Sequence, residues 1–407
     1  MIGWMSLALR LRRAVAHLLP APLSGFSDAA RDAVDRPGRP TVGLIAALVV
    51  TASIGWGLRW LTAEGHASGD TFWYTRQALE YVGNSEAQAT SEAAGYLVRL
   101  GHTRDPKPWV DLANSIDHRY PAIFESRPMY PLVAALLIPV AGLDAMVVSA
   151  ALGALIFAVA LGLVTHAVTG SARASVLAVA LAYALPSGQW LAFLYADGWM
   201  FAFWTISLGC ATAFLRQAGT GWLLALGIAL VGLFASKSAN GLVLVVAILA
   251  VAAIALVGRH PEQGRLWKLA TLGAGLAAGQ LVLFAVLGAP GINETLQDYF
   301  TKHFSVPDVE NPVRLLARRL LTLTPSLLRS VLAPLPLAVT AIGAIPLLTM
   351  RMPWAALWLA AGIATGLTVL VHPVLSEIPR LLAPVWITVA LGLSIGFARI
   401  SRPRSAA

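Results

Sequence analysis

Residues 220–258 read TGWLLALGIALVGLFASKSANGLVLVVAILAVAAIALVG, two long apolar runs that meet at Lys237, the only charged residue among them. Each run has about the length that an α-helix needs to cross a hydrocarbon core of ~30 Å. The runs are unbroken and rich in Ala, Leu, Val and Gly, whereas the strands of a membrane β-barrel are short and alternate apolar with polar residues. The stretch therefore predicts two membrane-spanning helices, over 220–236 and 238–258.

Similar runs recur along most of the 407-residue chain, of which 57% is hydrophobic and only 12% is charged. A soluble domain carries roughly twice that charged fraction. The sequence thus predicts an all-α polytopic membrane protein with about ten transmembrane helices. Their predicted ranges are 41–61, 144–168, 173–193, 197–216, 220–236, 238–258, 267–289, 326–350, 352–372 and 377–398.

The segment 128–141 is apolar but short, and Pro128, Pro131 and Pro139 interrupt it. This length is more typical of an interfacial or re-entrant helix than of a span. If the segment does not cross, both termini lie on one side, and the basic N-terminal residues place that side in the cytoplasm. The inner segments then carry 15 basic and 4 acidic residues, and the outer segments carry 14 and 16, which accounts for the net charge of +9. This topology explains the positive charge, so we expect no nucleic-acid partner.

The expected organisation is one membrane domain between two short cytoplasmic ends. Residues 1–40 form an Arg-rich lead with helical amphipathic spacing, which we expect to lie on the membrane surface. Residues 41–398 form the transmembrane domain, with a first outer loop over 62–143 and a second over 290–325. Residues 399–407 form a basic tail.

Asp70 stands at the start of a predicted helix of the first outer loop, in which Phe72, Arg76, Leu79 and Val82 or Gly83 follow at helical spacing, and we expect this helix to lie along the interface. It is the N-cap of that helix, a carboxylate that takes a proton from an acceptor hydroxyl, or both, since the two roles are compatible. Arg127 leads a Pro-framed turn that either docks a helix on the bundle or holds a phosphate by bidentate hydrogen bonds.

Further ionisable residues gather at the outer ends of predicted spans: Asp197, Lys237, His372, Glu377 and Arg380. Either these side chains reach for the interface, or packed helices bring them together around one outward-facing site. Patterns for metal ligands, a P-loop, a nucleophile elbow and HExxH are absent from the sequence.

The order of these pieces resembles that of the GT-C superfamily of membrane glycosyltransferases, which includes protein O-mannosyltransferases and the aminoarabinose transferases of lipid A. The resemblance covers about residues 41–398. It consists of an uncleaved first span and of motifs that follow it in a fixed order. Those motifs are Gly69-Asp70, Arg127-Pro-x-Tyr130-Pro131, Asp197 after the third span, Lys237 after the fifth, and Glu377-x-x-Arg380. The chain departs from the pattern in having fewer spans than many members and no C-terminal soluble domain. It also has Asp197 where many members have Glu, and Leu381 where Tyr often follows the Arg.

The resemblance implies an inverting transfer of a sugar from a polyprenyl-phosphate donor to a hydroxyl of a lipid, glycan or protein acceptor, at the outer face of a bacterial inner membrane. It implies catalytic carboxylates at Asp70, the general base, and at Asp197. Donor phosphate would be held by Arg127, Lys237 and Arg380, and substrate would be contacted by Tyr130, Glu377 and His372. Some members use a divalent metal and others use none. Besides donor and acceptor, membrane lipids are the expected partners.

Two alternatives remain open at this stage. A transporter or flippase of lipid-linked glycans would have ionisable residues deep within its spans and broken helices. A polysaccharide polymerase or ligase also has many spans and a large outer loop, but it transfers a preassembled glycan.

Overall fold

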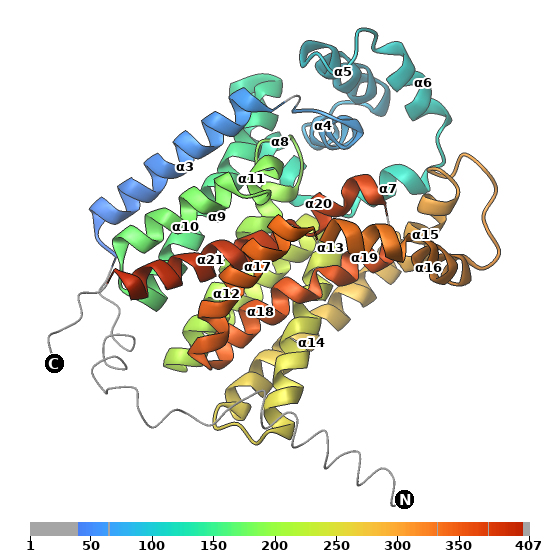
Figure 1. Ribbon diagram of the computed structural model, residues 1–407. Helices are drawn as coiled ribbons and strands as arrows, with labels where there is room; N and C mark the ends of the chain where they lie inside the picture. The colour runs from blue at the N-terminus through green and yellow to red at the C-terminus, as the bar shows by residue number, and fades with distance from the viewer. Residues whose placement is uncertain (1–39, 64–65, 332, 373, 402–407) are drawn as a thin grey trace, which may run out of the picture.

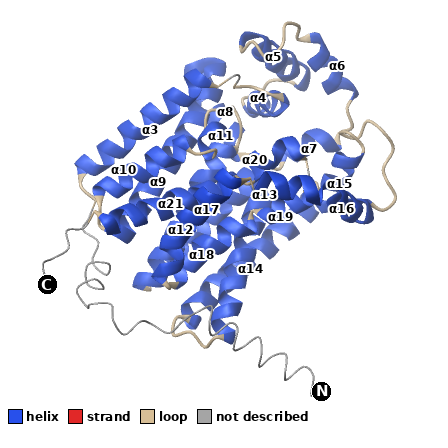
Figure 2. Ribbon diagram, viewed as in Figure 1, coloured by secondary structure: helices blue, strands red, loops and turns tan. Residues whose placement is uncertain are grey.

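The computed structural model describes residues 40–401 apart from 64, 65, 332 and 373. The predicted surface helix of the N-terminal lead and most of the basic tail lie outside the described residues. Every element in the described part of the chain is helical, as Figure 2 shows. Together with the apolar helices below, this establishes an all-α polytopic membrane protein.

Seven stretches of the described residues are long and apolar enough to cross a membrane. They are α3 (Val42–Thr62), α8 with η1 and α9 (Met129–Ala141, Gly142–Asp144, Ala145–Thr169), α12 (Asp197–Gln217), α13 (Thr220–Val257), α14 (Gln263–Leu287), α18 with α19 (Pro353–Ala364, Gly366–Val371) and α21 (Ala383–Ile400). Two shorter apolar helices accompany them, α10 (Ala172–Ala184) and α17 (Pro334–Met350). The other helices are α4 (Gly69–Tyr81), α5 (Glu86–Arg99), α6 (Lys107–Ser115), α7 (Arg119–Glu125), α11 (Ser187–Trp190), α15 (Ile292–Phe300), α16 (Pro312–Val331), η2 (Leu375–Glu377) and α20 (Ile378–Leu381).

Helix α12 runs through the middle of the bundle, whereas α3 lies at its edge. In their most apolar windows, 78% of α12 is buried inside the protein but only 17% of α3. Close backbone contact supports this packing, because a Cβ on Gly153 of α9 would lie 2.8 Å from the backbone nitrogen of Trp199 in α12. Trp358 of α18 is fully buried, and its indole N–H donates to the hydroxyl of Thr212 in α12 at 3.0 Å. The ends of α12 are therefore fixed relative to α9 and α18.

Helix α13 combines the two spans predicted over 220–236 and 238–258, and it is broken at Lys237 (φ −154°, ψ 97°). A Cβ on Gly241 would lie 2.5 Å from Phe234 Cδ1. Seven residues of a straight helix rise by about 10 Å, and a helical Phe side chain points toward the N-terminus, away from later residues. The contact between Gly241 and Phe234 therefore requires a sharp bend at Lys237.

Helices α4 to α8 form a second hydrophobic cluster at one end of the bundle (Figure 1). We predicted that the helix beginning near Asp70 lies along the membrane interface. The helix is present as α4, but every residue from Thr71 to Leu79 is buried, so this expectation about its surroundings is wrong. The reason is that α5, α7 and α8 all pack against α4, whereas an interfacial helix keeps one face in contact with lipid.

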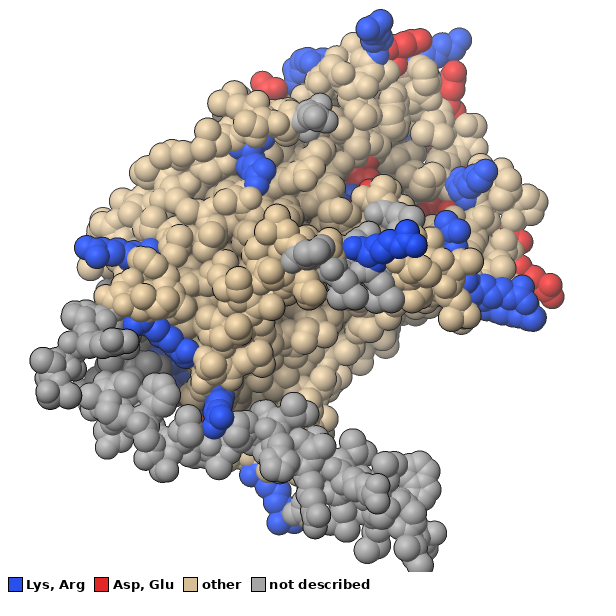
Figure 3. All heavy atoms as spheres, in the orientation of Figure 1, with Lys and Arg blue, Asp and Glu red and all other residues tan. Residues whose placement is uncertain are grey.

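The visible charges separate along the bundle. In Figure 3, the Asp and Glu side chains on the displayed face lie toward the end that carries α5, α6 and α15 in Figure 1, and the opposite end shows only Lys and Arg. Such a division is typical of proteins whose orientation is set by basic residues.

Candidate functional site

Arg380 of α20 is the centre of a cluster of ion pairs. Its Nε and Nη2 donate to Asp197 Oδ2 at 3.0 and 2.8 Å, and Nη2 also donates to Asp70 Oδ2 at 2.8 Å. Its Nη1 lies 3.4 Å from Glu377 Oε2. One guanidinium therefore joins the start of α4, the start of α12 and the segment before α21.

Asp197 is fully buried and is neutralised from two sides. Its Oδ1 accepts a hydrogen bond from Lys237 Nζ at 2.5 Å, and its Oδ2 accepts from Arg380. As the first residue of α12, it also lies at the partly positive end of that helix. A buried carboxylate stays charged only when it is paired in this way, so Asp197 depends on both Lys237 and Arg380.

Asp70 is the second residue of α4, and Ser68 is the N-cap. The hydroxyl of Ser68 accepts from the Asp70 amide at 3.2 Å, and the Thr71 hydroxyl accepts from the Ser68 amide at 3.1 Å. The interpretation of Asp70 as an N-cap is therefore wrong, because Ser68 already satisfies the free amide. The Asp70 carboxylate, with 24% of its side chain exposed, is directed to Arg380.

Aromatic rings enclose the guanidinium of Arg380. Its Cζ lies 4.1 Å from the ring centroid of Tyr195 and 5.9 Å from that of Trp190. Burial lowers the pKa of Arg380, but the carboxylates of Asp197, Asp70 and Glu377 outweigh it and raise this pKa well above its usual value. The guanidinium is therefore permanently charged and held in a fixed plane.

Arg127 is the third cation of the cluster and differs from the other two. Among the described residues, it forms no ion pair with a carboxylate; it is coupled to the buried Tyr74 and lies 5.9 Å from the ring of Phe124. Burial lowers the pKa of Arg127, while Tyr74 and Asp70 raise it above its usual value. Arg127 is thus charged, close to Asp70, and the cation best able to take up an incoming anion.

Of the remaining predicted site residues, His372 lies near the cluster and Tyr130 lies behind it. His372 is partly buried near Tyr299, with ring centroids 6.0 Å apart, and burial lowers its pKa, so its ring is mainly neutral at pH 7. Tyr130 is fully buried, and its hydroxyl donates to the carbonyl of Met146 at 3.1 Å. Its ring packs edge-on against Tyr74, so the structure places Tyr130 in the wall behind the cluster rather than beside Arg380.

Seven of the eight predicted residues therefore share one end of the bundle and interact with one another, either directly or through electrostatic coupling: Asp70, Arg127, Asp197, Lys237, His372, Glu377 and Arg380. We call the three carboxylates and three cations among them the Arg380 cluster. Its formal charges cancel, and an anion that binds Lys237 or Arg380 has to compete with a carboxylate. Two carboxylates lie within 2.8 Å of Arg380, those of Asp70 and Asp197. Asp70 is the one that an anion can displace more easily, because Asp197 is fully buried and is also paired with Lys237.

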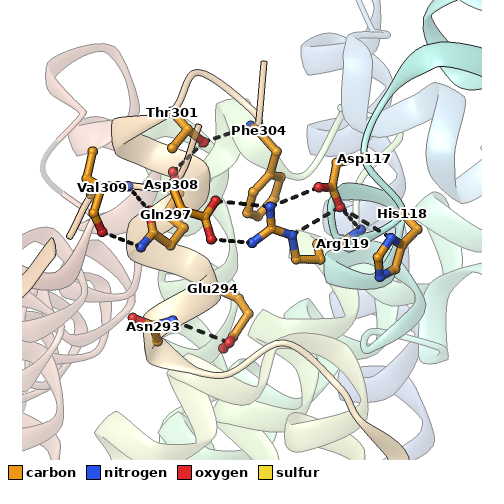
Figure 4. A network of polar contacts seen from close by, with 10 residues as sticks. All are labelled: Asp117, His118, Arg119, Asn293, Glu294, Gln297, Thr301, Phe304, Asp308 and Val309. Atoms are coloured by element: carbon orange, nitrogen blue, oxygen red, sulfur yellow. Dashed lines mark hydrogen bonds and ion pairs between the residues drawn. The ribbon is translucent and has the colours of Figure 1, made fainter. Parts of the chain in front are cut away.

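A second ion-pair network joins α7 to the segment that follows α15 (Figure 4). Arg119 of α7 donates to both oxygens of Asp308 at 2.7 and 3.0 Å and to those of Asp117 at 3.1 and 2.8 Å. The hydrogen bonds from Arg119 lower the pKa of Asp117 to about 2. Nearby, His303 Nδ1 lies 2.9 Å from Asp298 Oδ1, and the His303 ring lies 4.6 Å from that of Tyr120. These contacts hold the segment after α15 against α7.

The sequence did not single out Tyr195, Trp190 or Tyr74 as part of the site. Aromatic residues are common near membrane interfaces, so their presence alone gave no signal. The position of Tyr195, two residues before Asp197, was the available clue.

Within the described ranges there is no group of three or more His, Cys, Asp or Glu side chains able to hold a metal ion. The chain matches no protein-family model, no curated protein and no solved structure.

Proposed function

We propose that this protein is a glycosyltransferase that uses a polyprenyl-phosphate sugar and has the GT-C type of membrane fold. The observation that carries the proposal is the pairing of the partly exposed Asp70 with Arg380, beside Arg127, at one end of an apolar bundle. Transfer from a lipid phosphate needs a base for the acceptor hydroxyl and positive charge for the leaving phosphate. The Arg380 cluster contains both kinds of group.

The donor phosphate would bind Arg127 and displace Asp70 from Arg380 Nη2. Asp70 would then accept the proton of the acceptor hydroxyl while the hydroxyl oxygen forms a bond to the anomeric carbon of the sugar. The bond between that carbon and the phosphate oxygen breaks with inversion, and the polyprenyl phosphate leaves with its negative charge held by Arg127 and Arg380. In this scheme the buried Asp197 and Lys237 position Arg380.

The proposed topology has ten crossings. The seven candidate spans become eight when the two arms of α13 are counted separately, and α10 and α17 bring the number to ten. We propose that both termini are cytoplasmic, that the Arg380 cluster faces outward and that the membrane is a bacterial inner membrane. The separation of acidic from basic residues along the bundle supports this orientation.

The test is sugar transfer by purified protein supplied with a labelled polyprenyl-phosphate sugar and a cell-envelope lipid extract as acceptor. Asp70→Asn keeps the shape of the side chain but removes the base, and we expect a loss of roughly 10²-fold or more. Asp111→Asn is the matched control, because Asp111 is exposed on α6 of the same loop, and full activity is expected. Full activity of the Asp70→Asn variant would contradict the base assignment. The length of the transferred glycan separates a single-sugar transferase from a polymerase or ligase.

A transporter or flippase is the second candidate, and the broken α13 with its buried Lys237–Asp197 pair favours it. Broken helices and buried ion pairs at the membrane level are typical of transporters. Protein in sealed vesicles with a fluorescent lipid-linked sugar distinguishes the two functions. Movement of the lipid between leaflets without sugar transfer would favour the flippase.

A further inference from the structure

Helix α16 is basic and lies outside the Arg380 cluster. It carries Arg314, Arg318, Arg319 and Arg329, and the sequence has no Asp or Glu between residues 311 and 376. In Figure 1, α16 lies beside α15, at the side of the bundle that also carries α7 and α20. It is not among the candidate membrane spans of the described residues.

The exposed side of α16 has an apolar row next to a basic row. Val313 and Leu321 are exposed to 68% and 77%, and Ala317, one turn from each, is exposed as well. Arg314 and Arg318 lie on the adjoining row and are also exposed. The side that borders the apolar row away from the two arginines packs on the protein through Leu323, which is buried, and through the partly buried Leu316 and Leu320.

The two basic residues of this row are available to a partner. No Asp or Glu of the described residues forms an ion pair with Arg314 or Arg318. Arg319 points elsewhere, because its Nε donates to the Tyr299 hydroxyl at 3.0 Å. An exposed apolar row is unfavourable in water, and a guanidinium row at its border matches the charge of phosphate groups.

We infer that α16 lies in the bilayer interface, with Val313, Ala317 and Leu321 among the lipid chains and with Arg314 and Arg318 bound to the phosphates of anionic phospholipids. A helix with an apolar face and an Arg-rich border is typical of this location, and its binding depends on anionic lipid. The inference does not depend on the proposed transferase activity.

The experiment uses the full-length chain with Cys210→Ala, reconstituted in nanodiscs of phosphatidylcholine with or without phosphatidylglycerol. A bimane label is attached to Ala317→Cys on the apolar row or to Thr322→Cys, which continues the polar row of Arg314 and Arg318. Lipids with a doxyl group on the acyl chain quench labels that lie among the chains. We expect severalfold stronger quenching at position 317 than at 322, and stronger quenching at 317 when phosphatidylglycerol is present.

The double variant Arg314→Gln, Arg318→Gln should lose the effect of phosphatidylglycerol. Arg104→Gln, which removes an exposed arginine from the loop before α6, is the matched control and should keep it. Equal quenching at positions 317 and 322 in the otherwise unchanged chain would overturn the interfacial placement. If quenching at position 317 does not change with phosphatidylglycerol, or if the two substitutions leave that change intact, the proposed binding of anionic lipid by Arg314 and Arg318 is wrong.

Discussion

Arg380 binds three carboxylates with one side chain, which only the planar fork of a guanidinium can do. A lysine could reach one or two of these carboxylates, but it has no second pair of donors in a fixed plane. Burial of such a network adds little net stability, since desolvation offsets the attraction between the charges. The network instead fixes the position of Asp70. Asp70 and Asp197 both lie 2.8 Å from Arg380, but only Asp70 is partly exposed.

Arg380→Gln should destabilise the protein strongly, because it leaves the fully buried Asp197 with Lys237 as its sole charged partner. Removal of one member of a buried ion pair costs about 3–5 kcal/mol. Adding Asp197→Asn together with Lys237→Met should recover part of that loss, since no unpaired buried charge then remains. The measurement is thermal unfolding in detergent at constant lipid content.

Arg99→Gln is the control for this pair of variants. Arg99 pairs with Asp144, but both side chains are more than half exposed, so the expected cost is about 1 kcal/mol or less. If Arg380→Gln unfolds no more easily than Arg99→Gln, Arg380 does not neutralise Asp197 in the way described.

At the residue scale, the sequence was sufficient to single out Lys237 and Arg380, because a charged residue at the end of an apolar run is unusual, and Asp70, because it stands at the start of a predicted helix. It was not sufficient to pair them, since the pairs join residues up to 310 positions apart. It also misassigned the N-cap of α4. Ser68 and Asp70 are both good caps, and only the backbone geometry decides between them.

At the scale of elements, the break in α13 is the feature that brings Lys237 to Asp197. Two apolar runs with one lysine between them were enough to predict a division at this position. The sharpness of the bend was not predictable, because it depends on the fit of Phe234 against Gly241. The burial of α4 was missed for a related reason: the sequence shows the faces of a helix but not how many neighbours cover them.

Gly241→Ala should destabilise the protein by about 1–3 kcal/mol, because its new methyl group would lie 2.5 Å from the Phe234 ring. Gly275→Ala in α14 is the matched control. An added Cβ there meets no atom within 4 Å, and alanine is favoured over glycine inside a helix by about 1 kcal/mol.

Thermal unfolding of both variants in the same detergent measures the difference. A second substitution, Phe234→Leu, should reduce the penalty of Gly241→Ala, because the smaller side chain makes room at the bend. Equal melting temperatures for the two glycine variants would mean that the arms of α13 do not pack in this way.

At the scale of the whole molecule, the distribution of charge predicts which end faces the cytoplasm. Residues 258–268, the connection between α13 and α14 with the first turns of α14, contain Arg259, Arg265 and Lys268 with Glu262 as their only acid, whereas helices α4 to α7 carry many acids. Moving an arginine-rich connection across the membrane is unfavourable during insertion, so such connections stay inside. Gly264 should therefore be cytoplasmic and Arg104 should lie outside.

Single cysteines in the Cys210→Ala background test this topology in intact bacterial cells with a maleimide that cannot cross the membrane. Arg104→Cys should react in intact cells, and Gly264→Cys should react only after the membrane is permeabilised. Both positions are exposed, so permeabilised cells provide the control for reactivity. Labelling of Gly264→Cys alone in intact cells would invert the orientation and move the Arg380 cluster to the cytoplasmic side. Equal labelling of both in intact cells would mean an even number of crossings between them, which is incompatible with the five crossings that the ten-span arrangement places there, in α9, α10, α12 and the two arms of α13.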